Sequence, residues 1–311
     1  MLKEKVKNIP LLPGVYLMKD KHGSVIYVGK AKQLKNRVSS YFQQNKQHSN
    51  KVLRMIHTIV DFDFVVVDTE LDALLLECEL IQHYHPIYNR QMNYFTNYNY
   101  LQLTDSGFIL SDDPTSQSFG PFRSYKKMPT ILRILEETYQ MPWLKEISLL
   151  ALRTQLPTIS QLSFQQKKKE IYGLLQGRNK KILSYLKQRQ EHFIELLNFE
   201  RASSIQNEIE LMTSFIRQIR NQNAFLQTPY LTLALPVAAN PQLTKYYLVC
   251  YGQLVATSKL ANDIPPDFHS TAGSDTLAKK QQLTKAEVDP VQILLSYQRK
   301  LSKEPPQINN Q

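Results

Sequence analysis

Two short β-rich runs separated by a polar turn constrain the fold of this 311-residue chain more than any other feature. Residues 12–18 and 24–28 are rich in β-branched and aromatic side chains, and the polar residues 20–23 between them end in a glycine. Such runs on either side of a glycine-containing turn predict a β-hairpin. We therefore expect Tyr16 and Tyr27 to lie on neighbouring strands of one small sheet.

The segments that follow complete a small domain, which we place at residues 1–92. Apolar periodicity predicts two short helices, a third strand and a long helix, at residues 34–42, 52–59, 62–67 and 69–84. Thr69 suits the N-cap of the long helix, and Asp72 occupies the capping-box position three residues on. The buried stripe of this helix should contain Leu71, Leu74, Leu75, Cys78 and Ile81. The fold class is α/β, a three-stranded sheet with helices.

Three further segments are expected after this domain. Residues 93–165 read as a connecting region with strands at 100–104 and 108–110, a turn at 120–122 and a helix at 129–139. Residues 227–311 read as a small α+β segment of unknown role, with strands at 230–235, 245–251 and 254–259 and a last helix at 289–300.

The remaining segment, residues 166–226, is strongly helical. Apolar residues repeat there at spacings of three and four, which is typical of a helix seam. The seam consists of Ala202, Ile205, Ile209, Met212, Ile216 and Ile219. Asn198 is a good N-cap, so we predict an antiparallel helical hairpin that turns near residues 197–199.

The charge of the chain favours a polyanionic partner. The net charge is +11, and no acidic residue occurs between Asp20 and Asp61. A globular surface usually mixes its signs, so this window predicts a phosphate-binding face and favours a nucleic acid as the partner. The candidate DNA-binding residues are Lys32, Lys35, Lys46, Lys51 and Arg54.

Four residues near the hairpin suit the hydrolysis of a phosphodiester. That reaction needs an activated water, a clamp on the phosphate and neutralisation of the developing charge. Tyr27 has a phenol, whose pKa is ordinarily near 10, and a cation such as Lys30 would favour its ionised form. Arg37 offers a planar fork for a phosphate. Glu77 is a single carboxylate, which suits Mg²⁺ because that ion keeps much of its water shell.

The order and spacing of these residues resemble the GIY-YIG nuclease family and, within it, the N-terminal half of the excinuclease subunit UvrC. The resemblance is carried by the tripeptides GVY (14–16) and YVG (27–29), by the runs YVGKAKQLKNRVSSYF and DTELDALLLE, and by the final Pro-x-Tyr-Asn at 86–89. It covers roughly residues 5–225.

The resemblance implies a role for each site residue. Tyr27 would be the general base, Lys30 would support its ionised form, and Arg37 would hold the scissile phosphate. Glu77 would anchor one Mg²⁺ or Mn²⁺. Tyr16, Tyr41 and Asn89 would complete a hydrogen-bonded pocket, and no covalent intermediate is expected. The activity implied is a 3′ incision in double-stranded DNA during nucleotide excision repair.

The resemblance extends to the predicted helical hairpin, but with departures. Phe199, Glu200 and Ala202 resemble the UVR motif, which implies UvrB as a partner. The motif usually has an Arg-Asp pair where this chain has Gln206-Asn207, which weakens that expectation. Residues 141–163 contain no cysteine, so we expect no iron–sulfur cluster. Because the printed sequence ends at residue 311, the architecture resembles the stand-alone excinuclease Cho.

The remaining composition favours a cytoplasmic protein, and the resemblance implies a bacterial one that associates with the nucleoid during repair. No run approaches the roughly 20 apolar residues that a membrane span requires, and the start of the chain lacks a hydrophobic signal core. The two cysteines, Cys78 and Cys250, are isolated in sequence. Two alternatives stay open: a GIY-YIG nuclease for restriction or mobile-element DNA, and a non-catalytic DNA-binding adaptor.

Overall fold

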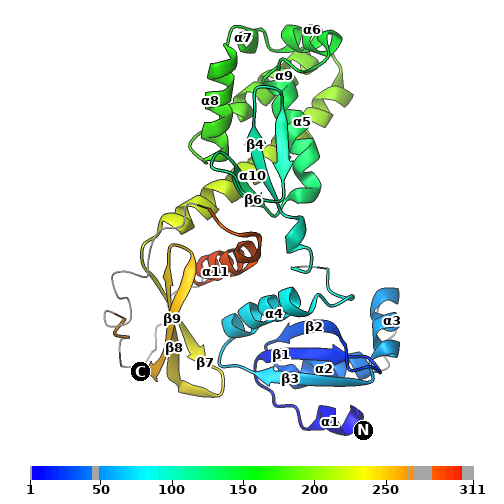
Figure 1. Ribbon diagram of the computed structural model, residues 1–311, viewed down its shortest axis with the longest axis vertical. Coiled ribbons are helices and arrows are strands. Elements are labelled where there is room, and N and C mark those ends of the chain that lie inside the picture. Colours follow the sequence, from blue (N-terminus) through cyan, green and yellow to red (C-terminus); the bar gives the residue numbers. More distant parts are fainter. Residues whose placement is uncertain are drawn as a thin grey trace. The chain divides into compact units, whose positions relative to one another are not determined.

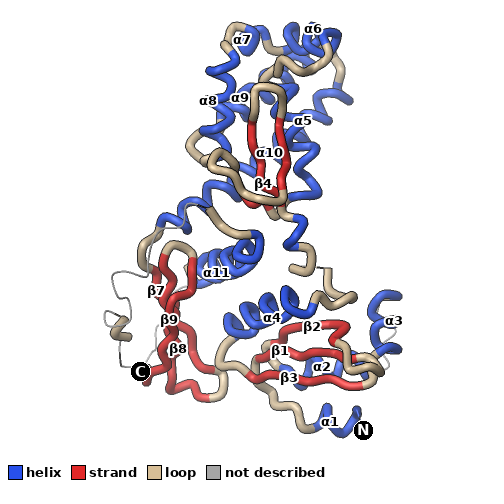
Figure 2. The backbone as a smooth tube through the Cα atoms, viewed as in Figure 1, coloured by secondary structure: helices blue, strands red, loops and turns tan. Residues whose placement is uncertain are grey.

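The computed structural model describes residues 2–43, 49–90, 92–262, 264, 266–268 and 282–302. The chain forms two compact units, which are shown in Figures 1 and 2. The first unit consists of Met1–Thr96 and Leu226–Gln311, and the helical unit consists of Asn97–Phe225. The finer division at residues 92, 165 and 226 stays a prediction. In the part of the chain that the structure describes, no helix has the length and apolar character needed to cross a membrane.

A three-stranded antiparallel sheet forms the centre of the first unit. Its strands are β1 (Gly14–Lys19), β2 (Val25–Ala31) and β3 (Asp61–Val66), in the order β2-β1-β3. The predicted hairpin is confirmed: Tyr16 lies opposite Gly29, and Met18 lies opposite Tyr27. Strand β2 is therefore an edge strand, and its outward-facing peptide groups need partners from elsewhere in the chain.

Helices cover both faces of this sheet. They are α1 (Leu2–Lys7), α2 (Leu34–Phe42), α3 (Asn50–Thr58) and α4 (Glu70–Tyr84). Side chains alternate along a strand, so Val15 and Leu17 pack with Ala73 and Ile81 of α4. Tyr16 and Met18 point to the opposite face, where Leu34, Val38 and Met55 of α2 and α3 pack. The tyrosines of the hairpin therefore face α2.

Helix α4 begins as predicted. The Thr69 side chain accepts a hydrogen bond from the Asp72 backbone N–H, and the Asp72 carboxylate accepts from the Thr69 backbone N–H. Leu71, Cys78 and Ile81 are buried. The helix ends at His85, whose left-handed backbone (φ 46°) precedes Pro86. The capping box fixes the residue at which the helix starts. It thereby sets the position of Glu77 along the helix relative to the sheet.

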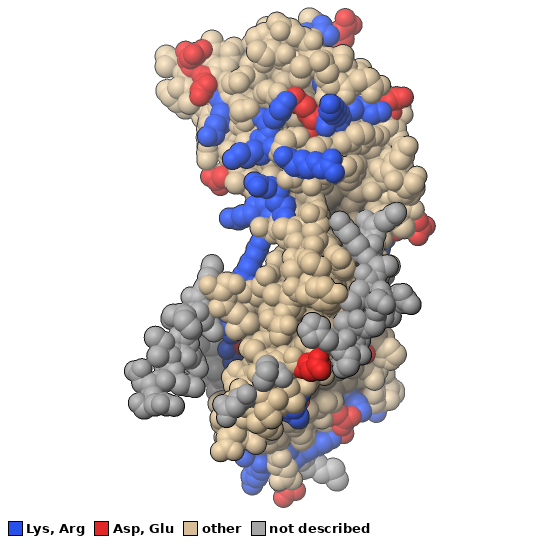
Figure 3. Space-filling model, turned by 90° about the vertical axis from the view of Figure 1, so that its left-hand side faces the viewer, with Lys and Arg blue, Asp and Glu red and all other residues tan. Residues whose placement is uncertain are grey.

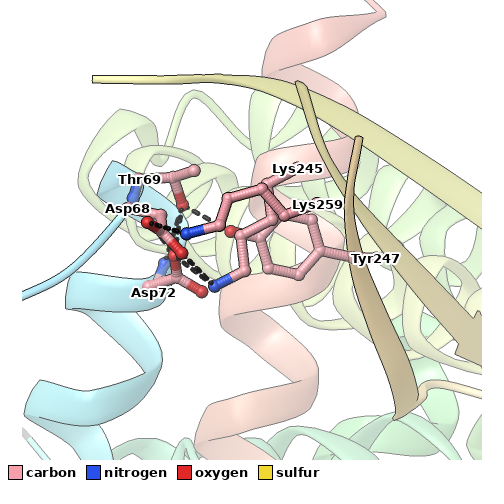
Figure 4. A network of polar contacts seen from close by, with 6 residues as sticks. All are labelled: Asp68, Thr69, Asp72, Lys245, Tyr247 and Lys259. Atoms are coloured by element: carbon pink, nitrogen blue, oxygen red, sulfur yellow. Dashed lines mark hydrogen bonds and ion pairs between the residues drawn. The ribbon is translucent and has the colours of Figure 1, made fainter. Parts of the chain in front are cut away.

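The C-terminal segment packs against the first turn of α4. It contains β7 (Leu231–Val237), β8 (Asn240–Cys250), β9 (Gln253–Ala261), the short 3₁₀ helix η3 (Lys285–Glu287) and α11 (Val288–Leu301). Figure 4 shows the contact: Lys245 Nζ lies 3.1 Å from Asp68 and 3.0 Å from Asp72, and Lys259 Nζ lies 2.9 Å from Asp68. The Tyr247 hydroxyl hydrogen-bonds to the hydroxyl of Thr69. This segment therefore braces the start of the helix that carries Glu77.

The helical unit begins with a second small antiparallel sheet, in the order β5-β4-β6. Its strands are β4 (Asn99–Leu103), β5 (Phe108–Ser111) and β6 (Phe119–Phe122). The turn predicted at residues 120–122 is wrong. This segment pairs with β4, and the ring of Phe122 packs against Phe215, with centroids 5.5 Å apart. Burial of the aromatic side chains outweighs the turn propensity of a Gly-Pro pair.

Helices make up the rest of this unit, and the four longest of them share one core with the sheet. They are η1 (Phe95–Asn97, which begins at the unit boundary), η2 (Tyr125–Lys127), α5 (Met128–Thr138), α6 (Glu146–Gln155), α7 (Pro157–Ser160), α8 (Phe164–Leu175), α9 (Lys181–Glu195) and α10 (Phe199–Gln227). The sequence did not predict α6. The predicted hairpin is confirmed as α9 and α10, because every residue of the predicted seam is buried. The side chain of Asn198 accepts from the Arg201 backbone N–H and caps α10.

Candidate active site

Three tyrosines from three elements meet above the hairpin. The Tyr16 and Tyr41 hydroxyls are 2.8 Å apart, and the Tyr27 ring lies 6.1 Å from Tyr16 and 6.4 Å from Tyr41. Tyr16 is almost fully buried. A Cβ atom at Gly29 would lie 2.4 Å from the Tyr16 hydroxyl and 2.9 Å from Tyr27. The glycine of the YVG tripeptide is therefore required because two phenols approach its backbone.

Arg37 provides the cation of this cluster. Its Nε donates to the Tyr16 hydroxyl at 3.4 Å, and its guanidinium carbon lies 4.9 Å from the centre of the Tyr41 ring. Burial, together with Tyr41 and Glu77, raises the pKa of Tyr27 well above its ordinary value, and Arg37 opposes that rise. Tyr27 is therefore a neutral phenol in this state, and a further positive charge would be needed to ionise it near pH 7.

Glu77 reaches the edge of β2 from α4. Its Oε1 accepts the Lys30 backbone N–H at 3.0 Å, one of the outward-facing groups of this edge strand. Among the described residues, none donates a hydrogen bond to its other oxygen, Oε2. Burial raises the pKa of Glu77, although the Lys30 N–H and the charges of Lys30 and Arg37 oppose the rise. The carboxylate is thus fixed through one oxygen and available for a ligand through the other.

Asn89 fills the next position along the same edge. Its Oδ1 accepts the Val28 N–H at 2.9 Å, and its Nδ2 donates to the Val28 carbonyl at 2.8 Å. The side-chain amide therefore pairs with β2 as a neighbouring strand would. Both ends of the amide bind the strand, so Asn89 shapes the site by positioning the backbone between Tyr27 and Gly29.

Lys30 points toward the start of α4. Its Nζ lies 3.1 Å from Glu70, which also binds Lys32 at 3.0 Å and Lys300 of α11 at 3.3 Å. Burial alone would raise the pKa of Glu70, but the hydrogen bonds and charges of Lys32 and Lys30 outweigh it and lower the pKa to about 2. Arg37, and not Lys30, is the cation that acts on the Tyr27 phenol in this arrangement.

One cleft of about 520 Å³ brings most of the predicted catalytic residues together. It is lined by the predicted residues Tyr27, Arg37, Tyr41, Glu77, Asn89 and Lys51, among others. Tyr16 lies beneath it, and Lys30 lies outside its lining. A cleft with a phenol, a guanidinium and a carboxylate open to a ligand can bind a phosphate and polarise a water molecule.

The other predicted DNA-binding residues lie outside this cleft. Lys32 is exposed and binds Glu70, Lys35 donates to the Lys7 carbonyl at 2.9 Å, and Arg54 is exposed on α3. Lys46 lies outside the described residues. A DNA-binding role for these four residues stays a prediction.

Arg90 is a cleft residue that the sequence did not predict. It is exposed, follows Asn89 directly and lines the cleft together with Tyr88. The Tyr88 backbone N–H donates to the Ile26 carbonyl at 3.1 Å, which folds this segment along β2. Lys51 donates to the Tyr88 carbonyl at 2.8 Å, and burial and Arg90 lower the pKa of Lys51. The only signal in the sequence was the position of Arg90 next to a motif asparagine.

The predicted partner-binding residues lie at the turn between α9 and α10. Phe199 is 64% exposed, and Glu200 is also exposed. Ala202 is buried, and its carbonyl accepts from Gln190 at 3.3 Å, so it holds the hairpin together. Ile194, Leu196 and Leu197 are exposed beside Phe199 in sequence. We call Ile194, Leu196, Leu197 and Phe199 the hairpin tip.

Comparison with known proteins defines the class of this site. Residues 12–90 match the family model of the UvrC-like GIY-YIG domain. The N-terminal domain belongs to this family, and it is a GIY-YIG endonuclease domain of the UvrC type, a phosphodiester hydrolase.

Curated relatives that match a longer part of this chain, beyond the N-terminal domain, are UvrC proteins. The chain is 34% identical over 231 residues to UvrABC system protein C of Clostridium tetani, a match to 66% of this chain and 36% of the relative. The protein of the same name from Caldicellulosiruptor saccharolyticus is 32% identical over 236 residues, 69% of this chain and 40% of the relative. The match therefore spans well under half the length of these curated relatives.

A solved structure is also similar. It is the crystal structure of the GIY-YIG N-terminal endonuclease domain of UvrC from Thermotoga maritima, bound to magnesium as its catalytic divalent cation. The identity is 40%, the match covers 28% of this chain and 94% of that chain, and the TM-score is 0.26.

The ion pairs of Glu70 with Lys30, Lys32 and Lys300 predict that the stability of the fold depends on pH. Because the folded-state pKa of Glu70, about 2, is lower than the ordinary value of 4.5, the ionised form stabilises the fold above pH 4.5. This contribution is lost as the pH falls from 4.5 toward 2. We expect Glu70→Gln to lower the free energy of unfolding by about 1–3 kcal/mol at pH 7, and the difference from wild type to shrink below pH 5. Urea denaturation at several pH values measures it. A difference that did not change with pH would contradict the ion-pair explanation.

Proposed function

We propose that this protein is a DNA endonuclease of nucleotide excision repair, which hydrolyses one phosphodiester on the 3′ side of a lesion in a UvrB-marked duplex. The observation that carries the proposal is the convergence of Tyr27, Arg37 and Glu77 in one cleft of a UvrC-type domain. The name of the curated relatives, UvrABC system protein C, supports a repair substrate.

In the proposed reaction, water is the nucleophile. Tyr27 acts in its ionised, phenolate form: its Oη takes a proton from the water, whose oxygen forms a bond to phosphorus while the bond to the leaving oxygen breaks and that oxygen takes a proton from solvent. Arg37 binds the non-bridging oxygens and stabilises the charge that develops on them. The products are two strand ends, one of which carries the phosphate, and no bond forms between the protein and DNA.

Glu77 is the residue that would hold a divalent ion, Mg²⁺ or Mn²⁺. When bound, the ion supplies Lewis-acid stabilisation at the phosphate and favours ionisation of nearby oxygens. The free Oε2 of Glu77 and the open cleft beside it fit an ion that keeps most of its waters. The described residues contain no group of three or more His, Cys, Asp or Glu that could hold a metal ion, so one carboxylate with water is the arrangement that we propose. The similar UvrC domain of Thermotoga maritima is bound to magnesium, which supports the choice of ion.

An incision assay tests the proposal. The substrate is a labelled duplex with one bulky adduct, loaded with UvrA and UvrB, and the same duplex without the adduct serves as its control. We expect one nick 3′ of the adduct that requires Mg²⁺ and disappears with EDTA. Equal Mg²⁺-dependent nicking of the undamaged duplex would favour a restriction or mobile-element nuclease, and DNA binding without cleavage would favour an adaptor. Either result would overturn the proposal.

We further propose that the hairpin tip binds UvrB. Apolar side chains that are this exposed, with Leu197 at 73%, are typical of a protein interface. The Gln206 side chain accepts a hydrogen bond from Gln190 and donates one to Glu210, both within the unit. We therefore place the proposed UvrB contact at the hairpin tip and not at Gln206-Asn207, where the usual Arg-Asp pair is missing. A Cho-like restriction to the 3′ cut and a cytoplasmic, nucleoid-associated location stay predictions.

A single substitution tests the UvrB contact. We expect Phe199→Ala to weaken UvrB binding at least about 10-fold, because the loss of an apolar anchor typically costs more than 1 kcal/mol. Ile109→Ala is the control, since Ile109 is an exposed apolar residue of β5 in the same unit. Binding is measured by titration calorimetry with purified UvrB. Equal affinity for Phe199→Ala and wild type would remove the tip from the interface.

A further inference from the structure

The helical unit has cations that no acidic side chain neutralises. Several lysines and arginines of this unit do form an ion pair with a carboxylate, such as Lys168 with Asp105 at 2.8 Å and Lys181 with Glu170 at 2.7 Å. Five exposed cations lie on α8, at the α8–α9 turn and on α10, and none of them has a salt-bridge or hydrogen-bond partner for its side chain among the described residues. These are Lys169, Arg178, Lys180, Arg217 and Arg220, and we call them the basic face. Figure 3 shows Lys and Arg side chains gathered on one side of this unit with few acidic side chains between them.

Packing brings these residues together from separate parts of the chain. The turn between α8 and α9 lies directly on α10: a Cβ atom at Gly177 would lie 3.1 Å from the Arg220 side chain, and Asn223 donates to the Gln176 carbonyl at 2.9 Å. Gly177 has φ +72°, which lets the chain turn at this close approach. Arg217 and Arg220 are three residues apart on α10, so they lie on neighbouring positions of one helix face.

The turn that carries Arg178 and Lys180 is held in one conformation. The Arg178 backbone N–H donates to the Gly173 carbonyl at 2.7 Å, and the Asn179 side chain donates to the Glu170 carbonyl at 2.9 Å. The cations are therefore presented from a preorganised loop, which lowers the entropy lost when a ligand binds.

The surface beside the turn has the composition of a phosphate-binding site. A cleft of about 770 Å³ is lined by Lys169 and Arg178 together with neutral amides such as Gln176 and Asn179. Its one carboxylate, Glu170, binds Lys181 and the Tyr185 hydroxyl. Cations and amides whose one acidic neighbour is already paired suit phosphate and sugar oxygens.

The neighbouring residues favour the backbone of a duplex over other partners. The Tyr172 ring in this cleft packs against Phe119, with centroids 5.5 Å apart, and its hydroxyl donates to the Leu103 carbonyl. It is therefore not available to stack on an unpaired base. In the described part of the helical unit, the exposed large apolar side chains lie on β5, on α6 and at the hairpin tip, not on α8 or the α8–α9 turn. A protein or membrane interface would need such side chains here.

We propose that the basic face is a second nucleic-acid surface, which binds the phosphate backbone of double-stranded DNA without reading its sequence. This inference rests on the proposed function, because that function makes duplex DNA the substrate. The face adds affinity for the duplex outside the nuclease cleft, and it takes no part in the chemical step.

The test measures DNA binding by the full-length chain without metal, so that cleavage does not interfere. The triple variant Lys169→Gln, Arg178→Gln, Arg220→Gln is compared with a control triple, Lys145→Gln, Arg153→Gln, Lys187→Gln, which removes the same charge from exposed positions elsewhere in the unit. Fluorescence anisotropy of a labelled undamaged duplex at several salt concentrations gives the dissociation constant and its salt dependence. Thermal melting of each variant confirms folding, and Arg178→Gln alone provides a single-site variant at an exposed loop residue.

We expect the first triple variant to bind DNA at least about 10-fold more weakly at low salt. The slope of log K against log salt should also fall in magnitude by roughly 2–3, because each phosphate that the variant no longer neutralises removes about 0.9. The control triple should keep most of the affinity and the slope. Equal affinities and slopes for the two triples would overturn the proposal. Unchanged DNA binding with loss of UvrB binding would also overturn it, in favour of an acidic protein partner. Because binding to undamaged duplex is measured without cleavage, the result stays distinct from any failure of the incision assay.

Discussion

Glu77→Gln is expected to abolish Mg²⁺-dependent nicking, with a loss on the order of 10³-fold in the single-turnover rate, while the protein stays at least as stable as wild type. The two effects have one cause. Burial raises the pKa of Glu77, so the folded protein holds this carboxylate at a cost that a neutral amide avoids. The Gln side chain still offers an oxygen to the Lys30 N–H, but it loses the charge that binds the ion.

The matched control is Glu79→Gln, an exposed carboxylate two residues along the same helix. It should leave both the nicking rate and the melting temperature close to wild type. Substantial Mg²⁺-dependent nicking by Glu77→Gln would show that the ion binds elsewhere. A large loss of stability would show that the carboxylate has a structural role that the Lys30 contact does not explain.

Tyr27→Phe is expected to lower the nicking rate by about 10²–10⁴-fold, the range that general-base catalysis typically contributes. The substitution removes only the hydroxyl from a ring that packs beside Tyr16 and Tyr41. DNA binding should therefore change little, since Arg37 keeps its position through Tyr16 and Tyr41. Single-turnover rates at saturating protein, together with dissociation constants for DNA, separate the two quantities.

Tyr84→Phe is the control for that experiment, because Tyr84 is a tyrosine of α4 that is 44% exposed. Its rate should match wild type. If Tyr27→Phe lost binding and rate in the same proportion, the hydroxyl would be a binding group. If the rate were unchanged, another group or a water bound near Glu77 would be the base.

The N-terminal domain was largely predictable because its signals are local. The turn at residues 20–23, the capping box of Thr69 and Asp72, and the alternation of apolar residues in the strands all act within a few residues. The segment at residues 120–122 was mispredicted because its pairing with β4 and the burial of Phe122 depend on residues far away in the chain. Helix α6 was missed, and its single buried residue, Leu152, shows how weak its apolar signal is.

The sequence alone predicted the candidate reacting groups: the order of Tyr16, Tyr27, Arg37, Tyr41, Glu77 and Asn89 was sufficient to indicate the chemistry. Only the tertiary structure decided what each group contacts. It assigned Lys30 to Glu70, used Asn89 to pair the edge of β2, and added Arg90 to the cleft. It also placed the basic face, because Lys169, Arg178 and Arg220 become neighbours only when the α8–α9 turn packs on α10. The physical reason is the same in each case: residue types and short spacings encode local structure and reactivity, whereas hydrogen-bond partners and charge neighbours arise between segments that are distant in sequence and meet only in the folded chain.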